Sequence, residues 1–183
     1  MFYPQLVQVG DILSYRYKKT DLVGDMIGFF SNGGKYSHTS GISKLADENG
    51  TFTIIESHIE TGVVEKELNP KWYEIIDVYR YSSGLSDEQK ACLIEYLRKN
   101  EIGKPYDLAA FPSAWAKGVM AQLFGWKNFS KCRPLLNDDA HRFCTELWEA
   151  AYWNALKIEL NPGIDYHSVN PSLLTKGKVF QVC

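Results

Sequence analysis

The pattern of apolar and polar residues predicts a series of β-strands in the first half of the chain. A strand is expected at 10–17, and another at 36–42, where short, β-branched and aromatic residues follow a Gly-Gly turn signal. A third is expected at 51–58, where alternation sends Ile55 to one face and Glu56 and His58 to the other. Shorter strands are predicted at 63–64 and 75–81, with a turn at Asn69-Pro70 between them.

Helical spacing of apolar residues appears in three other stretches. The first covers 21–30 and ends before an Asn-Gly-Gly turn. The second follows a capping-box sequence at 86–89 and extends to Lys99, with Cys92 expected in its core as an inert thiol. The third runs from Cys144 to Leu156, so that Cys144 lies in the first turn of the predicted helix.

An apolar, aromatic-rich run at 107–126 contains Pro112 and Lys117. It is too short and too broken for a membrane span, so no stable membrane insertion is expected. Three interpretations remain open: a buried pair of core helices, a lid over an acyl or peptide pocket, or a patch that docks a partner.

Composition is typical of one enzyme-sized domain covering 1–183. The 183 residues are 45% hydrophobic and 23% charged, enough to bury a substantial core. The formal net charge of -2 gives no electrostatic footprint for nucleic acid. A monomer or dimer is expected. The first predicted strand begins too early to leave room for a signal peptide, which indicates a cytoplasmic protein or one exported after removal of a leader.

The four cysteines show no C-x-x-C spacing, which argues against a zinc ribbon or a redox pair. A mixed metal site of Cys144, His38 and His58 would lack a ligand pair of the usual tight spacing, so neither a metal nor a cofactor is expected. Cys144 has a different potential role. A helix N-terminus favours thiolate over thiol, which would make Cys144 a nucleophile rather than a buried hydrophobe.

His38 is the best candidate for a base that would activate this thiol. It lies in a predicted strand, and an imidazole can take a thiol proton near neutral pH and return it to a leaving group. Glu56 is an acid within a largely apolar strand. A buried carboxylate needs a partner, and a neighbouring imidazole would supply one while the carboxylate orients it. His58 falls on the same face and is the reserve orienting residue.

Five segments together resemble a known family, the circularly permuted NlpC-type papain-like cysteine amidases of the YiiX/YaeF type, which are related to the lecithin:retinol acyltransferase group. The segments are Gly10-Asp11-Ile12-Leu13, Tyr36-Ser37-His38-Thr39, Ile55-Glu56, Gly103-Lys104-Pro105-Tyr106-Asp107 and Phe143-Cys144-Thr145-Glu146. Val169-Asn170-Pro171 resembles that family's closing loop. The strands precede the cysteine helix, which is the permuted order. The Asn-Cys-Glu-His box of the acyltransferase relatives is absent, which favours the amidase-like branch.

The resemblance implies an α+β fold, in which an antiparallel sheet or barrel packs against helices and the catalytic Cys begins one of them. It implies acyl transfer through a thioester, with Cys144 as nucleophile, His38 as base and Glu56 orienting His38. Tyr106, Tyr36, Ser37 and His58 are expected near the substrate, and Glu146 is expected to face solvent.

The leading substrate is an amide bond in a small peptide, a cell-wall peptide or an acyl amide. Two alternatives remain. One is a lipid thioesterase or acyltransferase that uses the same thiol, and the other is a non-catalytic binding module on the same fold.

Overall fold

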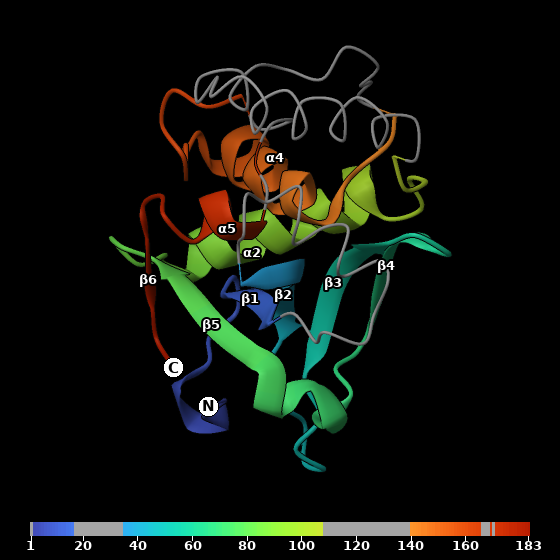
Figure 1. Ribbon diagram of the computed structural model, residues 1–183, viewed down its shortest axis with the longest axis vertical. Coiled ribbons are helices and arrows are strands. Elements are labelled where there is room, and N and C mark those ends of the chain that lie inside the picture. The colour runs from blue at the N-terminus through green and yellow to red at the C-terminus, as the bar shows by residue number, and fades with distance from the viewer. Residues whose placement is uncertain (1, 17–34, 108–139, 166–168, 170) are drawn as a thin grey trace.

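A computed structural model describes residues 2–16, 35–107, 140–165, 169 and 171–183. Its centre is a six-stranded antiparallel sheet with the strand order β4-β3-β2-β1-β5-β6 (Figure 1). The strands are β1 (Ile12–Arg16), β2 (Tyr36–Lys44), β3 (Thr53–His58), β4 (Gly62–Glu67), β5 (Ile76–Tyr81) and β6 (Val179–Gln181).

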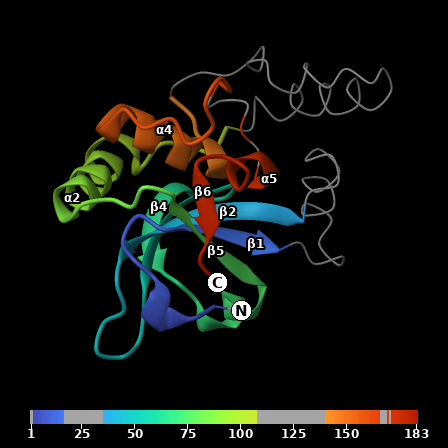
Figure 2. The same ribbon diagram turned by 90° about the vertical axis from the view of Figure 1, so that its left-hand side faces the viewer.

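The α-helices lie together on one side of this sheet (Figure 2). They are α2 (Asp87–Tyr96), which continues into the π-type segment η3 (Leu97–Glu101), α4 (Cys144–Leu156) and the short α5 (Pro171–Leu174). Two 3₁₀ segments complete the described elements, η1 (Pro4–Leu6) and η2 (Pro70–Ile75). None of the helices formed by these residues has the length and apolar character needed to cross a bilayer.

The expected strands all form, and α4 begins at Cys144 and ends at Leu156, as its periodicity predicts. Ser86 caps α2 through a capping box with Gln89, as expected. Asn69 and Pro70 begin η2 instead of forming a simple turn, because the Asn69 side chain accepts a hydrogen bond from the Lys71 backbone. The helix expected at 21–30 and the run from 108 to 126 lie outside the described residues.

The prediction for Cys92 is wrong, because its thiol is exposed. Leu93 and Leu97 are four residues apart and completely buried, so they define the face of this segment that enters the core. Cys92 precedes Leu93 and lies off that face. Its Sγ lies 3.7 Å from the Ala155 carbonyl oxygen at the edge of α4.

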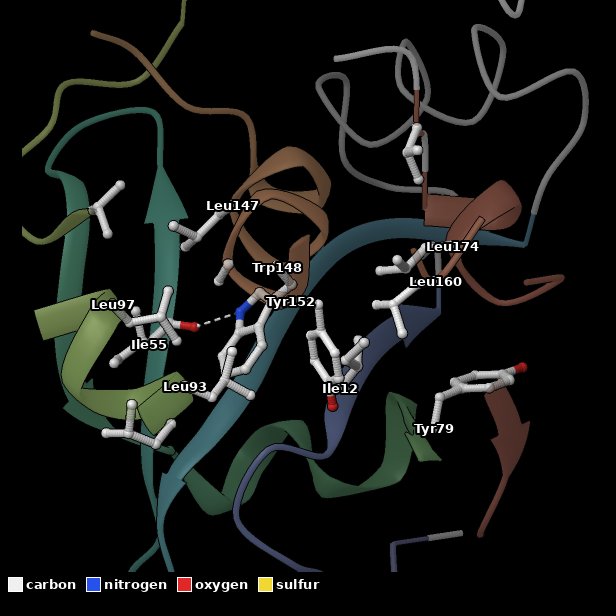
Figure 3. Packing of buried hydrophobic residues seen from close by; sticks show 14 of the residues in the cluster. Ile12, Ile55, Tyr79, Leu93, Leu97, Leu147, Trp148, Tyr152, Leu160 and Leu174 are labelled. Carbon is white, nitrogen blue, oxygen red and sulfur yellow. Dashed lines mark hydrogen bonds between the residues drawn. The ribbon is translucent and has the colours of Figure 1, made fainter. Parts of the chain in front are cut away.

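The main apolar core lies between the sheet and the helices (Figure 3). Trp148 of α4 is fully buried, and its indole N–H donates a 3.1 Å hydrogen bond to the Ile55 carbonyl on β3. Its ring lies against Gly41 of β2, where a Cβ atom would come within 2.3 Å of the indole. The missing side chain at Gly41 therefore lets α4 approach the sheet closely, one helical turn beyond Cys144.

A second apolar cluster is formed by strand side chains that point to the other face of the sheet, including Leu13, Ile42 and Ile54. Ile54 and Ile55 belong to different clusters, as the predicted alternation of the third strand requires. The strands are thus buried on both faces. A polar side chain that points from a strand into either cluster must therefore find a partner within the fold.

Candidate active site

The His38 imidazole on β2 and the Glu56 carboxylate on β3 contact each other across neighbouring strands. Ser40 pairs with Glu56 in the register of the two strands, so His38 lies diagonally opposite Glu56. His38 Nε2 and Glu56 Oε2 are 2.9 Å apart. The Glu56 side chain is 5% exposed and that of His38 is 24% exposed, so solvent competes little for this contact.

Cys144 brings a thiol to the same imidazole from the first residue of α4. The Cys144 side chain is a hydrogen-bond partner of His38, and Cys144 is buried. Because Nε2 is occupied by Glu56, Nδ1 is the nitrogen that remains for the thiol. The imidazole therefore connects the sulfur to the carboxylate.

These two partners make His38 a strong base. Burial alone lowers the pKa of the imidazole, but hydrogen bonds with Cys144 and Glu56 outweigh burial and raise that pKa from 6.5 to about 10. Both partners favour the imidazolium form. A basic imidazole next to a thiol is the arrangement that cysteine nucleophiles require.

Lys66 on β4 approaches the other side of Glu56. Its Nζ lies 2.5 Å from Glu56 Oε1, while Oε2 faces His38. Burial alone raises the pKa of Glu56, but His38 and Lys66 together lower it to about 2. Lys66 was not predicted as a residue of the site. The register of the β3–β4 hairpin could have indicated it. This register pairs Lys66 with Ile54, and Ile54 points to the same face of β3 as Glu56.

Tyr15 of β1 covers the imidazole from a third strand. Its ring centroid is 5.2 Å from that of His38, and its hydroxyl forms a 2.9 Å hydrogen bond with Ser40 Oγ. Tyr15 was not predicted, since its position depends on the pairing of β1 with β2. Its contact restricts the orientation of the His38 ring.

Tyr106 lies close to Cys144, in agreement with its expected place near the site. Its backbone forms a parallel bridge with Arg142, and its ring packs edge-on against Phe143 at 5.5 Å. Burial raises the pKa of the phenol, and the charges of Cys144 and Asp107 raise it further. Tyr106 therefore keeps its phenolic proton at neutral pH.

Three other residues expected at the site occupy different environments. The His58 ring lies 6.5 Å from the His38 ring, and its Nδ1 accepts a 3.3 Å hydrogen bond from the Glu60 backbone, so Glu56 is the residue that contacts the base. Ser37 is partly exposed on β2. Tyr36 is 1% exposed and its hydroxyl donates a 2.6 Å hydrogen bond to Asp77 Oδ2, so the structure places this side chain in the core.

The segment before α4 is held by a buried ion network. Arg142 Nε lies 2.8 Å from Glu101 Oε2, and the Arg142 carbonyl accepts a 2.6 Å hydrogen bond from Ser57 on β3. Glu146 was expected to face solvent, which is wrong. It is 1% exposed, it accepts a hydrogen bond from the Phe143 backbone and it lies 3.6 Å from Arg142 Nη1. The Arg142 charge compensates the burial of Glu146.

The described residues contain no group of three or more His, Cys, Asp or Glu side chains arranged to hold a metal ion. His38 Nε2 lies 2.9 Å from Glu56 Oε2, and the imidazole also interacts with Cys144, so these side chains are partners of one another. The described part of the site thus has the donors of an acid–base pair and lacks the geometry of a metal centre.

The fold is an α+β fold in which a six-stranded antiparallel sheet packs against a few helices. No protein-family model matches the sequence, and no curated protein matches it significantly. Among solved structures it is similar to YiiX of Escherichia coli O157:H7, a DUF1105 protein named as a metalloprotein. The TM-score is 0.55, with 22% sequence identity over 93% of this chain and 80% of YiiX. The chain therefore has a YiiX-like fold, and the residues described here do not fit the metal that the name of YiiX implies for that protein.

Proposed function

We propose that this protein is a cysteine hydrolase that cleaves amide bonds through Cys144, His38 and Glu56. The observation that carries the proposal is the position of the His38 imidazole, which contacts a buried thiol on one side and a buried carboxylate on the other. A structural histidine needs only one of these partners. A thiol, a base and an orienting acid in series are what nucleophilic catalysis by cysteine requires.

In the proposed reaction, Cys144 Sγ attacks the substrate carbonyl carbon while His38 holds the thiol proton. His38 then donates that proton to the departing amine as the carbon–nitrogen bond breaks, leaving a thioester on Cys144. A water molecule attacks the thioester and gives a proton to His38. The carbon–sulfur bond breaks, the acid product leaves, and the sulfur remains as a thiolate beside the protonated His38, ready for the next substrate. Glu56 stays ionised throughout and orients the imidazole.

The first turn of α4 supplies the electrostatic part of this mechanism. Backbone N–H groups at a helix start have no intrahelical partners, and they favour negative charge near Cys144 Sγ. The Cys144 N–H is the proposed donor to the oxyanion of the tetrahedral intermediate. Tyr106, whose ring packs against Phe143 at the start of α4, is a proposed substrate contact.

We infer the substrate class from the resemblance of the chain's segments to those of permuted NlpC-type amidases. We propose that the protein cleaves amide bonds of small peptides. Cell-wall-type peptides that contain γ-linked glutamate are the leading candidate substrates. Acyl thioesters and lipid esters are the comparison substrates, because the same thiol could attack them.

The rate of Cys144 alkylation by iodoacetamide against pH tests the paired thiol and base. Peptide mass mapping follows each thiol separately, so that the exposed Cys92 serves as an internal control. For each thiol, the measured quantity is the alkylation rate at pH 6 divided by the rate at pH 9. We expect this ratio to be roughly tenfold larger for Cys144 than for Cys92, and we expect His38→Ala to remove the difference. A Cys144 profile that follows Cys92 and ignores His38→Ala would refute the nucleophile–base pair and favour a binding module.

Hydrolysis then separates the substrate classes. Release of amine from γ-glutamyl dipeptides by the parent protein, abolished in Cys144→Ala, is the expected result. Cleavage of acyl thioesters without any amide hydrolysis would contradict the amidase proposal and establish lipid chemistry at the same thiol.

A further inference from the structure

Lys66 and Glu56 are diagonal neighbours on β3 and β4. The register pairs Ile54 with Lys66 and Glu56 with Val64, so the Lys66 side chain starts from the face that carries Glu56. Lys66 Nζ reaches to 2.5 Å from Glu56 Oε1. The Lys66 side chain is 50% exposed whereas Glu56 is 5% exposed, so a solvent-accessible cation contacts a buried anion.

The two oxygens of Glu56 have different partners. Oε2 faces His38 Nε2 at 2.9 Å, and Oε1 forms the ion pair with Lys66. A buried carboxylate is costly unless both oxygens are compensated. Among the described residues, Lys66 is the only lysine or arginine that forms an ion pair with Glu56. Lys66 therefore compensates the charge at the carboxylate oxygen that does not face the imidazole.

The charged and titratable groups around this pair come from each neighbouring element. Tyr15 of β1 and His38 of β2 face Glu56 from one side, and Lys66 of β4 faces it from the other. Cys144 of α4 faces His38, and the His58 ring of β3 lies against the His38 ring. In the reactive state, charges alternate along the series: thiolate, imidazolium, carboxylate, ammonium.

We propose that Lys66 is a positioning residue for the hydrolase, which holds the Glu56 carboxylate oriented toward His38 and thereby keeps the imidazole paired with an anion while it serves Cys144. The inference rests on the proposed function and deepens it. Loss of the ammonium would leave Oε1 uncompensated, and Glu56 would take up a proton at higher pH. His38 would then lose its anionic partner, and Cys144 would lose the imidazolium that stabilises its thiolate.

The pH profile of Cys144 alkylation in Lys66→Met tests this without any substrate. We expect the acid limb of the profile to move upward by about one pH unit, which corresponds to roughly a tenfold slower reaction on that limb. Lys66→Arg keeps the charge and should retain the parent profile. Lys71→Met, at an exposed lysine of η2, removes the same charge away from the site and should also retain it.

A double variant shows whether Lys66 acts through Glu56. In a Glu56→Gln background, Lys66→Met should cause no further shift, because there is no carboxylate for Lys66 to hold. Superimposable profiles for Lys66→Met and the parent, or equal shifts in Lys66→Met and Lys71→Met, would overturn the proposal. If Lys66→Met does not fold, Lys66→Gln replaces it with the same expected shift.

The same data distinguish the two proposals. If the parent Cys144 shows reactivity at low pH that depends on His38, but Lys66→Met changes nothing, only the role of Lys66 fails. If the parent Cys144 reacts like Cys92 at every pH, the proposed function fails, and the positioning role fails with it.

Discussion

At the scale of single residues, the site depends on how one imidazole is shared. His38 uses Nε2 for Glu56 and has Nδ1 left for Cys144, so each partner influences the other through the ring. The sequence was sufficient to predict these three residues, because each carries an unusual feature of its local segment. It was not sufficient for Lys66 and Tyr15, since their positions depend on strand registers that local patterns do not specify.

The protonation of His38 can be followed directly by NMR. The chain has four histidines, so single substitutions assign their signals. We expect the His38 imidazole to titrate well above 6.5, near the value of about 10 that its partners impose. In Cys144→Ala its pKa should fall, because the imidazolium loses one of its two stabilising contacts. An unchanged titration in Cys144→Ala would show that the thiol does not interact with the ring.

Because of Glu56, the free energy of unfolding is expected to depend on pH in the acidic range. The pKa of Glu56 falls from 4.5 in an ordinary environment to about 2 in the fold, so the ionised carboxylate stabilises the protein fully above pH 4.5. That contribution disappears as the pH falls toward 2. Urea denaturation should therefore show the difference in unfolding free energy between the parent and Glu56→Gln shrinking from pH 6 to pH 3. A constant difference across that range would contradict the lowered pKa.

At the scale of elements, the placement of α4 against the sheet determines whether thiol and base meet. The start of α4 was predictable, because helical periodicity is a local property of 144–156. The burial of Glu146 was not, since it depends on a charge contributed by Arg142. The exposure of Cys92 depends likewise on which face of α2 and η3 enters the core.

Gly41→Ala should push α4 away from β2, because the new methyl group would overlap the Trp148 indole. We expect a loss of about 1–3 kcal/mol in the free energy of unfolding, measured by urea denaturation, and slower alkylation of Cys144 at low pH. In a Trp148→Leu background the added methyl group should cost less, because the ring that it would strike is gone. Equal costs in both backgrounds would show that the indole is not the obstacle.

Ser86→Ala provides a contrasting case on α2. It removes the side-chain acceptor for the Gln89 backbone N–H, which should cost about 1 kcal/mol of unfolding free energy. The pH profile of Cys144 alkylation should not move, since Ser86 caps a helix that supplies no residue to the site. A shifted profile would mean that α2 influences the site beyond its packing.

At the scale of the whole molecule, Arg142 joins three distant parts of the chain. It pairs with Glu101 after α2, accepts a hydrogen bond from Ser57 on β3 and lies two residues before Cys144. The sequence gives no sign of this network, because its members are far apart in the chain. Lys104 also contacts Glu101, at 2.9 Å, so the network includes cations from two segments.

Arg142→Met should destabilise the protein by about 3 kcal/mol, because Glu101 and Glu146 would remain buried with less compensation. Arg98→Met is the matched control. Arg98 is half-exposed and pairs with Glu65 at the surface, so its loss should cost about 1 kcal/mol or less. Chemical denaturation of both variants measures the difference, and similar losses would show that the Arg142 network is not a significant support of the fold.

The chain order of the site also matters during synthesis. The strands that carry His38, Glu56 and Lys66 leave the ribosome before Cys144, which belongs to the last long helix described. The incomplete chain thus has the acid–base half of the site without its thiol. Since the imidazole and the sulfur meet only after α4 docks on the sheet, the newly made polypeptide completes this arrangement only when folding has largely enclosed it.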